Sequence, residues 1–148
     1  MVYMVLVLLH LLGASVWIGG HIVLVSVVMP TARRERDPRR IVEFERGFGR
    51  VGIVALIVQL ATGLWLADRW LGGWPNILRQ PTPASHLVLA KLGLLAATLV
   101  LAGHAYHRIL PRLDRARMRS FALYAWATTI LAVLLLIVGA SIRLGGPL

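Results

Sequence analysis

The sequence predicts an all-α integral membrane protein, folded as a bundle of four transmembrane helices. The chain of 148 residues is 58% hydrophobic, with a mean hydropathy of +0.76. Continuous apolar runs longer than about 18 residues are typical of membrane-spanning helices. Four such runs leave too little chain for a separate soluble domain. We therefore expect one transmembrane domain over residues 1–148, with helices at about 3–29, 51–70, 86–107 and 121–142.

The first run is expected to stay in the protein as a helix. It has no basic segment before it, its apolar stretch is too long for a signal peptide, and no small-residue cleavage site precedes Pro30. A soluble four-helix bundle is the alternative fold, but its helices would each carry a polar stripe, which these runs lack. The chain has no cysteine, which excludes disulfides, iron–sulfur clusters and thiolate metal sites.

Arginine is distributed unevenly between the connections, and this predicts the orientation of the chain. Five arginines lie within 31–40 and five within 108–119, whereas the connection between the second and third runs has only Arg69 and Arg79. An excess of Lys and Arg marks cytoplasmic loops. We therefore expect a multi-pass protein of the inner (plasma) membrane, with both termini on the periplasmic or extracellular side. Its basic loops would meet anionic lipid headgroups, so the expected partner is the lipid bilayer and no nucleic acid.

The connection between the second and third runs has a character of its own. Trp70 and Trp74 are expected to anchor a helix end at the membrane interface. Three prolines, Pro75, Pro81 and Pro83, favour an extended, non-helical cap over the outer face.

The five histidines are confined to the first and third runs. On an α-helix His10 and His21 lie within about 20° of one face, and His86 and His104 also share a face. His107 follows His104 by one turn. The first and third helices run parallel, because one helix intervenes between them. His21 and His104 then fall at similar depth in the cytoplasmic half, with His10 in the outer half and His86 near the outer surface.

Ionisable side chains at membrane depth are candidates for function, and imidazole binds haem iron, copper and zinc. We expect His21 and His104 to be ligands of one metal centre, with haem iron as the favoured metal and His107 as the reserve ligand. His10 would belong to a second metal or haem site, and the nearest polar side chain of the third helix to that site is Lys91. Histidines that only hydrogen-bond a neighbouring helix are the alternative.

The sequence predicts no carboxylate near this metal centre, and it places many small residues beside the histidines. Asp68 lies at a helix end and the other acidic residues are expected in loops, which weakens a hydrolytic zinc site and a carboxylate proton relay. Small residues flank the histidines: Gly13, Ala14, Gly19, Gly20, Gly103 and Ala105. They allow close helix packing or leave room for a flat macrocycle. Gly20 in particular is expected to contact a neighbouring helix or ligand.

The motif HLLGASVWIGGHIVL (10–24) resembles the first-helix signature of the copper-resistance protein D (CopD) family. The resemblance continues through FGRVGIVALIVQLATGLWLA (48–67) and LAKLGLLAATLVLAGHAYHRILPRL (89–113). It implies a four-helix membrane protein that handles copper. His21, His104 and His107 lie outside the general pattern of that family, which implies a branch with an added metal or haem site.

The same layout is similar to the HemJ-type membrane proteins linked to protoporphyrinogen oxidation. That similarity implies bound haem b, with His10 and Lys91 at the positions of the family's first-helix histidine and helix-three lysine. The chain departs from the HemJ pattern after His10, where WIGGH replaces a more aromatic continuation.

Three functions remain open at this point. The first is a membrane protein with one or two haem b groups that transfers electrons and could act as an oxidoreductase, with a quinone or another redox protein as candidate donor or acceptor. The second is a CopD-like protein that binds or transports copper. The third is a structural or assembly subunit, and a homo-oligomer is compatible with all three.

Overall fold

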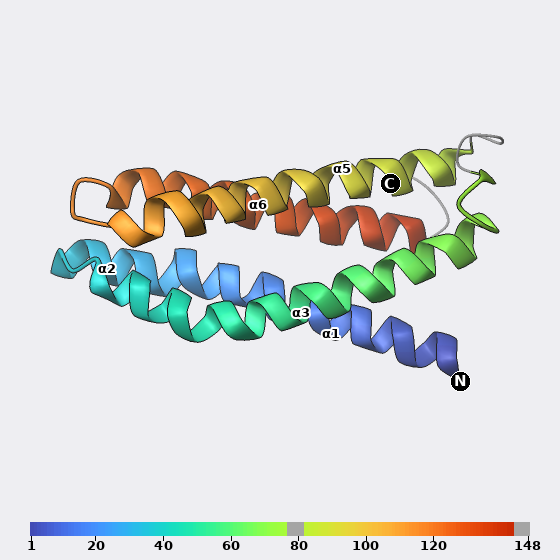
Figure 1. Cartoon of the computed structure of the whole chain (residues 1–148), viewed down its shortest axis with the longest axis horizontal. Helices are drawn as coiled ribbons and strands as arrows, with labels where there is room; N and C mark the ends of the chain where they lie inside the picture. Colours follow the sequence, from blue (N-terminus) through green and yellow to red (C-terminus); the bar gives the residue numbers. More distant parts are fainter. Residues whose placement is uncertain (77–81, 144–148) are drawn as a thin grey trace.

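The computed structural model describes residues 1–76 and 82–143, and it is all α-helical over these ranges. Four long helical stretches lie side by side (Figure 1). Their elements are α1 (Val2–Val23), η1 (Leu24–Val28), α2 (Met29–Glu35), α3 (Arg39–Leu71), α5 (Pro83–His104), η2 (Ala105–Ile109), η3 (Leu110–Arg112) and α6 (Met118–Arg143). Within these ranges, four helices are long and apolar enough to cross a bilayer. The predicted class, a multi-pass all-α membrane protein, is confirmed.

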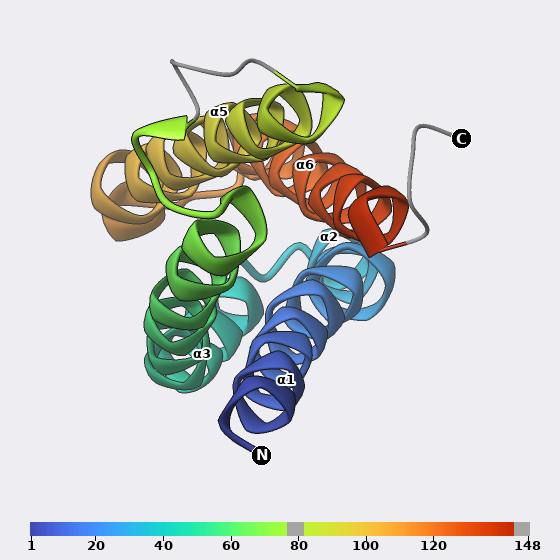
Figure 2. The same ribbon diagram turned by 90° about the vertical axis from the view of Figure 1, so that its right-hand side faces the viewer.

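The four stretches form a ring in which α1 and α5 lie opposite each other. α1 packs on α3 and α5 packs on α6, while smaller contacts of α1 with α6 and of α3 with α5 close the ring (Figure 2). Figure 1 shows that α1 and α5 run in the same direction, as the sequence predicts. Both connections rich in arginine lie at one end of the bundle, and the start of α1 lies at the other. These ends are called the arginine end and the termini end below.

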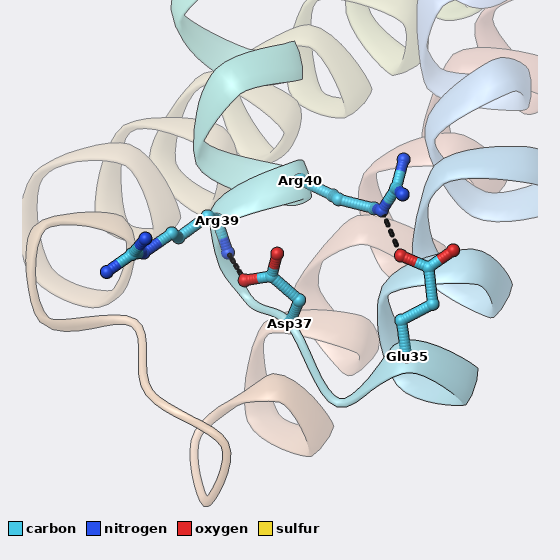
Figure 3. A network of polar contacts seen from close by, with 4 residues as sticks. All are labelled: Glu35, Asp37, Arg39 and Arg40. Atoms are coloured by element: carbon cyan, nitrogen blue, oxygen red, sulfur yellow. Dashed lines mark hydrogen bonds and ion pairs between the residues drawn. The ribbon is translucent and has the colours of Figure 1, made fainter.

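The helices at the arginine end extend beyond the apolar runs. The first stretch continues to Glu35 and α3 begins at Arg39 rather than near residue 51, so the link between them is only three residues long. Figure 3 shows how polar contacts close this link: Arg40 Nε donates to Glu35 Oε2, and Asp37 Oδ1 accepts from the main-chain nitrogen of Arg39 at 3.0 Å. Hydropathy could not predict these extensions of the two helices, because their residues are helical but charged.

At the termini end, the connection between α3 and α5 is capped on both sides. Gly72 ends α3 with a φ of 67°, a left-handed conformation that glycine adopts without steric cost. Thr82 and Ser85 form a reciprocal capping box at the start of α5. Pro83 is therefore the first helical residue of α5 and not part of an extended cap, because proline suits the first turn of a helix. Arg79 and Pro81 lie outside the described residues.

Two wide π-helical turns interrupt the helices near the arginine end. They span Leu24–Val28 and Ala105–Ile109, and each is followed by a proline, Pro30 and Pro111 respectively. Proline has no N–H to donate, so the regular hydrogen-bond ladder cannot continue through it. The wide turns accommodate this break without ending the helix.

The largest cluster of buried apolar side chains in the described part of the chain lies in the arginine half of the bundle. A buried cluster there joins all four stretches: Leu24, Val25, Met29, Ala32, Ile41, Ala105, Leu110, Met118, Phe121, Ala122 and Ala125. The termini half contains the larger interior space described next.

Candidate functional site

Two cavities lie end to end inside the bundle. The termini-side cavity has a volume of about 520 Å³ and is lined by all four long helices, with His10 and Lys91 among its walls. The arginine-side cavity has a volume of about 240 Å³ and includes His21 and His107. Each half of the protein thus has one cavity whose mainly apolar lining includes titratable side chains.

His10 is brought against α3 by a close helix crossing. A Cβ on Gly13 would lie 2.9 Å from the main-chain oxygen of Ala55, so only glycine allows the two backbones to approach this closely. One turn earlier, the ring of His10 rests on Gly63, where a Cβ would lie 2.8 Å from His10 Cε1. Two glycines on facing helices therefore create the space that the imidazole occupies.

The orientation of the His10 ring is fixed by α3. His10 Nδ1 donates to the main-chain oxygen of Gln59 at 2.9 Å and also lies 3.1 Å from Thr62 Oγ1. The Thr62 hydroxyl donates its own proton to the Val58 carbonyl, so toward His10 it accepts. With the proton on Nδ1, Nε2 is the basic nitrogen of the ring. Metal-binding histidines commonly show this arrangement, in which one nitrogen donates to a carbonyl and the other binds the metal.

Lys91 lines the same cavity from the opposite side of the bundle. It is the only lysine of the chain, and it lies against α6, where a Cβ on Gly139 would be 3.0 Å from Lys91 Nζ. No acidic side chain lines this cavity among the described residues. Gln59 adds a second polar group, since its Oε1 atom is buried and has no hydrogen-bond partner among the described residues. Buried oxygen atoms of this kind are costly unless a ligand or water satisfies them.

The arginine-side cavity combines aromatic walls with titratable groups. His21 Nδ1 donates to the main-chain oxygen of Trp17 at 2.9 Å, and the two rings lie 4.6 Å apart between centroids. Phe48 packs edge-on against His21 and stacks on Phe44 at 5.5 Å. His107 enters the lining from the wide turn that follows α5.

Glu45 also lines this cavity, which corrects the expectation that the acidic residues near the membrane lie in loops. It is half-buried on α3, because that helix begins at Arg39 and not near residue 51. The argument against carboxylate chemistry, which rested on the absence of such a group, therefore no longer holds for the arginine side.

The structure separates His104 and His86 from both cavities. The exposed ring of His104 stacks on Tyr124 of α6, with centroids 5.3 Å apart and an interplanar angle of 16°. His107 and not His104 shares the cavity with His21. His86 is exposed near the start of α5. The pairing of His21 with His104 at one metal centre stays a prediction, with the lining favouring the reserve ligand His107.

No group of three or more His, Asp or Glu side chains within residues 1–76 and 82–143 is arranged to hold a metal ion. A metal in either cavity would therefore take part of its coordination from amides, hydroxyls, water or a second molecule. Sequence reasoning missed Gln59 and Thr62 as neighbours of His10. The signal was present, because these two polar residues sit three apart within the second apolar run and so share a helix face.

A comparison with protein families shows the family of the chain. Residues 42–144 match the family model described as Copper resistance protein D. The chain belongs to the CopD family. Comparisons with curated proteins and with solved structures find no match. The CopD match includes Lys91, His104 and His107 and begins after α1, so the first-helix motif with His10 and His21 rests on resemblance alone.

Proposed function

We propose that this CopD-family protein binds copper within the membrane, in the termini-side cavity, with the imidazole of His10 as the principal ligand. The observation that carries the proposal is the position of the His10 imidazole, which lines the cavity and is oriented there by the hydrogen bond from Nδ1 to the Gln59 carbonyl. The family match supports copper as the metal, and the lining of the cavity supports His10 as a ligand.

The donor atoms around this cavity are nitrogen and oxygen. Besides His10, the cavity offers the unsatisfied Oε1 atom of Gln59 and the amine of Lys91. The chain has no cysteine, and none of the described residues that line the two cavities is a methionine. Imidazole, amide and amine ligands suit Cu(II), whereas Cu(I) prefers the soft sulfur ligands of Cys and Met. We therefore propose that copper is bound as Cu(II), as cargo and not as a resident cofactor.

Haem b is the second candidate, and the volume of the cavity favours it. About 520 Å³ is far more than one hydrated ion needs and lies within the roughly 300–1,000 Å³ of organic ligand sites. His10 would then hold the iron, and Lys91 would face the carboxylates of the macrocycle. Haem would supply one-electron chemistry at this site. The proposed electron transfer, with a quinone or protein as partner, belongs to this candidate alone.

One preparation distinguishes the two candidates. The protein is purified in detergent without added metal, its visible spectrum is recorded, and its metal content is measured before and after incubation with Cu(II) and desalting. The copper proposal expects no Soret band and about one retained copper per chain. A Soret band with sharp α-bands after reduction would replace copper by haem b. A colourless protein that retains no copper would contradict both and leave a structural role.

A further inference from the structure

The boundary between the two cavities is formed by very few residues. Trp17 of α1 and Leu56 of α3 are the two described residues that line both. The termini-side cavity extends to Tyr3 and Trp70, which are exposed at that end of the bundle. The arginine-side cavity extends to His107, which is exposed near the other end. The interior is thus a nearly continuous path, interrupted at Trp17 and Leu56.

The indole of Trp17 is held in place by its neighbours on α1. The imidazole of His21 packs 4.6 Å from the Trp17 ring and donates from Nδ1 to the Trp17 carbonyl one turn earlier. On the adjacent helix α3, Leu56 adds a branched apolar side chain to the linings of both cavities. Large apolar side chains at such a boundary exclude hydrated ions, as the hydrophobic constrictions of channels do.

Polar groups lie on both sides of this constriction. His10, Gln59 and Lys91 line the cavity before it, and His21, Glu45 and His107 line the cavity after it. Each side therefore offers nitrogen or oxygen ligands to a cation, and the constriction itself offers none. This alternation is what a stepwise route across a bilayer requires, because an ion must be bound on both sides of a closed barrier.

We propose that Trp17, together with Leu56, is the barrier between two chambers of a transmembrane route, each chamber open to its own side of the membrane. The identity of the cargo, copper, rests on the proposed function above, whereas the barrier rests only on the two cavities. Displacement of the Trp17 ring joins the chambers and lets the cation pass from the chamber lined by His10 to the chamber lined by His21, Glu45 and His107.

The absence of cysteine makes the barrier directly testable by thiol labelling. Ala67→Cys places a thiol in the termini-side cavity and Ala102→Cys places one in the arginine-side cavity. Leu123→Cys, on a side chain that is 71% exposed on the outside of α6 and lines neither cavity, is the control. Right-side-out and inside-out vesicles are treated with a charged, membrane-impermeant methanethiosulfonate. We expect the two cavity thiols to react from opposite sides and the control thiol from neither.

The same measurement is repeated with the barrier removed. Trp17→Ala should make both cavity thiols reactive from both sides, with at least a tenfold faster reaction from the side that was closed. Trp126→Ala, which removes a lipid-facing tryptophan that lines neither cavity, should leave labelling one-sided. If Trp17→Ala does not fold, as judged by size-exclusion elution, Leu56→Ala takes its place. Two-sided labelling when Trp17 and Leu56 are both present, or one-sided labelling in folded Trp17→Ala and Leu56→Ala variants, overturns the barrier.

Copper flux into proteoliposomes tests the cargo separately. We expect Trp17→Ala to raise the flux of Cu(II) several-fold over the wild-type protein, and His10→Ala to lower it in the same background. Flux that is equal in protein-free and Trp17→Ala vesicles, alongside the expected labelling, overturns copper as the cargo while the barrier stands. The failure of the route and the failure of the copper assignment therefore give different results.

Discussion

The imidazole of His10 on α1 donates a hydrogen bond to the main-chain oxygen of Gln59 on α3, with 2.9 Å between the two atoms. Because the acceptor belongs to the backbone, no substitution of the Gln59 side chain removes it. The orientation of the ring depends instead on the residues around this contact, above all on Thr62 and Gly63. These residues provide the most direct tests of the site.

Gly63→Ala should displace the His10 ring. The added Cβ would lie 2.8 Å from Cε1, so the imidazole must move away from the Gln59 carbonyl. We expect Cu(II) affinity to fall about tenfold, the lower end of the cost of disturbing a residue that orients a metal ligand. Gly93→Ala is the matched control, since no atom lies within 4 Å of the Cβ it adds. Equal affinities of the two variants in isothermal titration would show that Gly63 plays no part in holding the ring.

Thr62→Val tests the second contact of His10 Nδ1. Valine keeps the shape of the side chain and removes the oxygen that lies 3.1 Å from the ring. We expect a loss of Cu(II) affinity of up to about tenfold, because the ring loses a contact that fixes its orientation. Thr98→Val is the control: Thr98 is buried in the lining of the same cavity, and its hydroxyl donates to the Leu94 carbonyl. A larger loss in the control than in Thr62→Val would remove the orienting role of Thr62.

Gly20→Ala should destabilise the packing of α1 on α3. A Cβ at this position would lie 1.9 Å from Phe48 Cζ, which confirms the expected close contact of Gly20 with a neighbouring helix. Overpacking of this kind typically costs about 1–3 kcal/mol. We expect a lower Tm in detergent and a lower yield of folded protein. Gly19→Ala adds a Cβ with no atom within 4 Å, so its Tm should not fall, and an equal fall in both would point to a general effect of alanine.

The existence and class of the helices could be predicted from the sequence, because a lipid-spanning helix must be apolar over most of its length. Their ends could not, because turns such as those from Arg39 onward are charged and helical at once. Glu45 was missed for the same reason: its place beside the arginine-side cavity follows from the early start of α3.

The contents of each cavity depend on helix rotation, which hydropathy leaves undetermined. On an ideal helix Lys91 points away from the face of His86 and His104, and the structure indeed places it in a cavity that neither of them lines. Depth in the membrane is the only basis on which the sequence pairs His21 with His104. In the structure, the rotation of α5 and the wide turn that follows it bring His107 to the cavity that His21 lines. Depth can be counted along a sequence, but facing directions come from packing.

The orientation of the bundle in the membrane remains a prediction from the arginine-rich connections. Both lie at one end of the bundle, which the positive-inside rule assigns to the cytoplasm of a protein in the inner membrane. An alkaline phosphatase fused after residue 148 should therefore be active, and a fused cytoplasm-dependent fluorescent protein should stay dark. The opposite pair of results would invert the sides of both cavities.

Binding of Cu(II) to the purified protein in lipid nanodiscs tests the central claim most directly. The wild-type protein, His10→Ala and the control His86→Ala, which removes an exposed histidine, are titrated and then measured by electron paramagnetic resonance. We predict one tight Cu(II) site per chain with nitrogen hyperfine structure in the wild-type and His86→Ala proteins. His10→Ala should bind at least tenfold more weakly and lose the nitrogen pattern of that site. An unchanged affinity and spectrum in His10→Ala would contradict the assignment of His10 as the copper ligand.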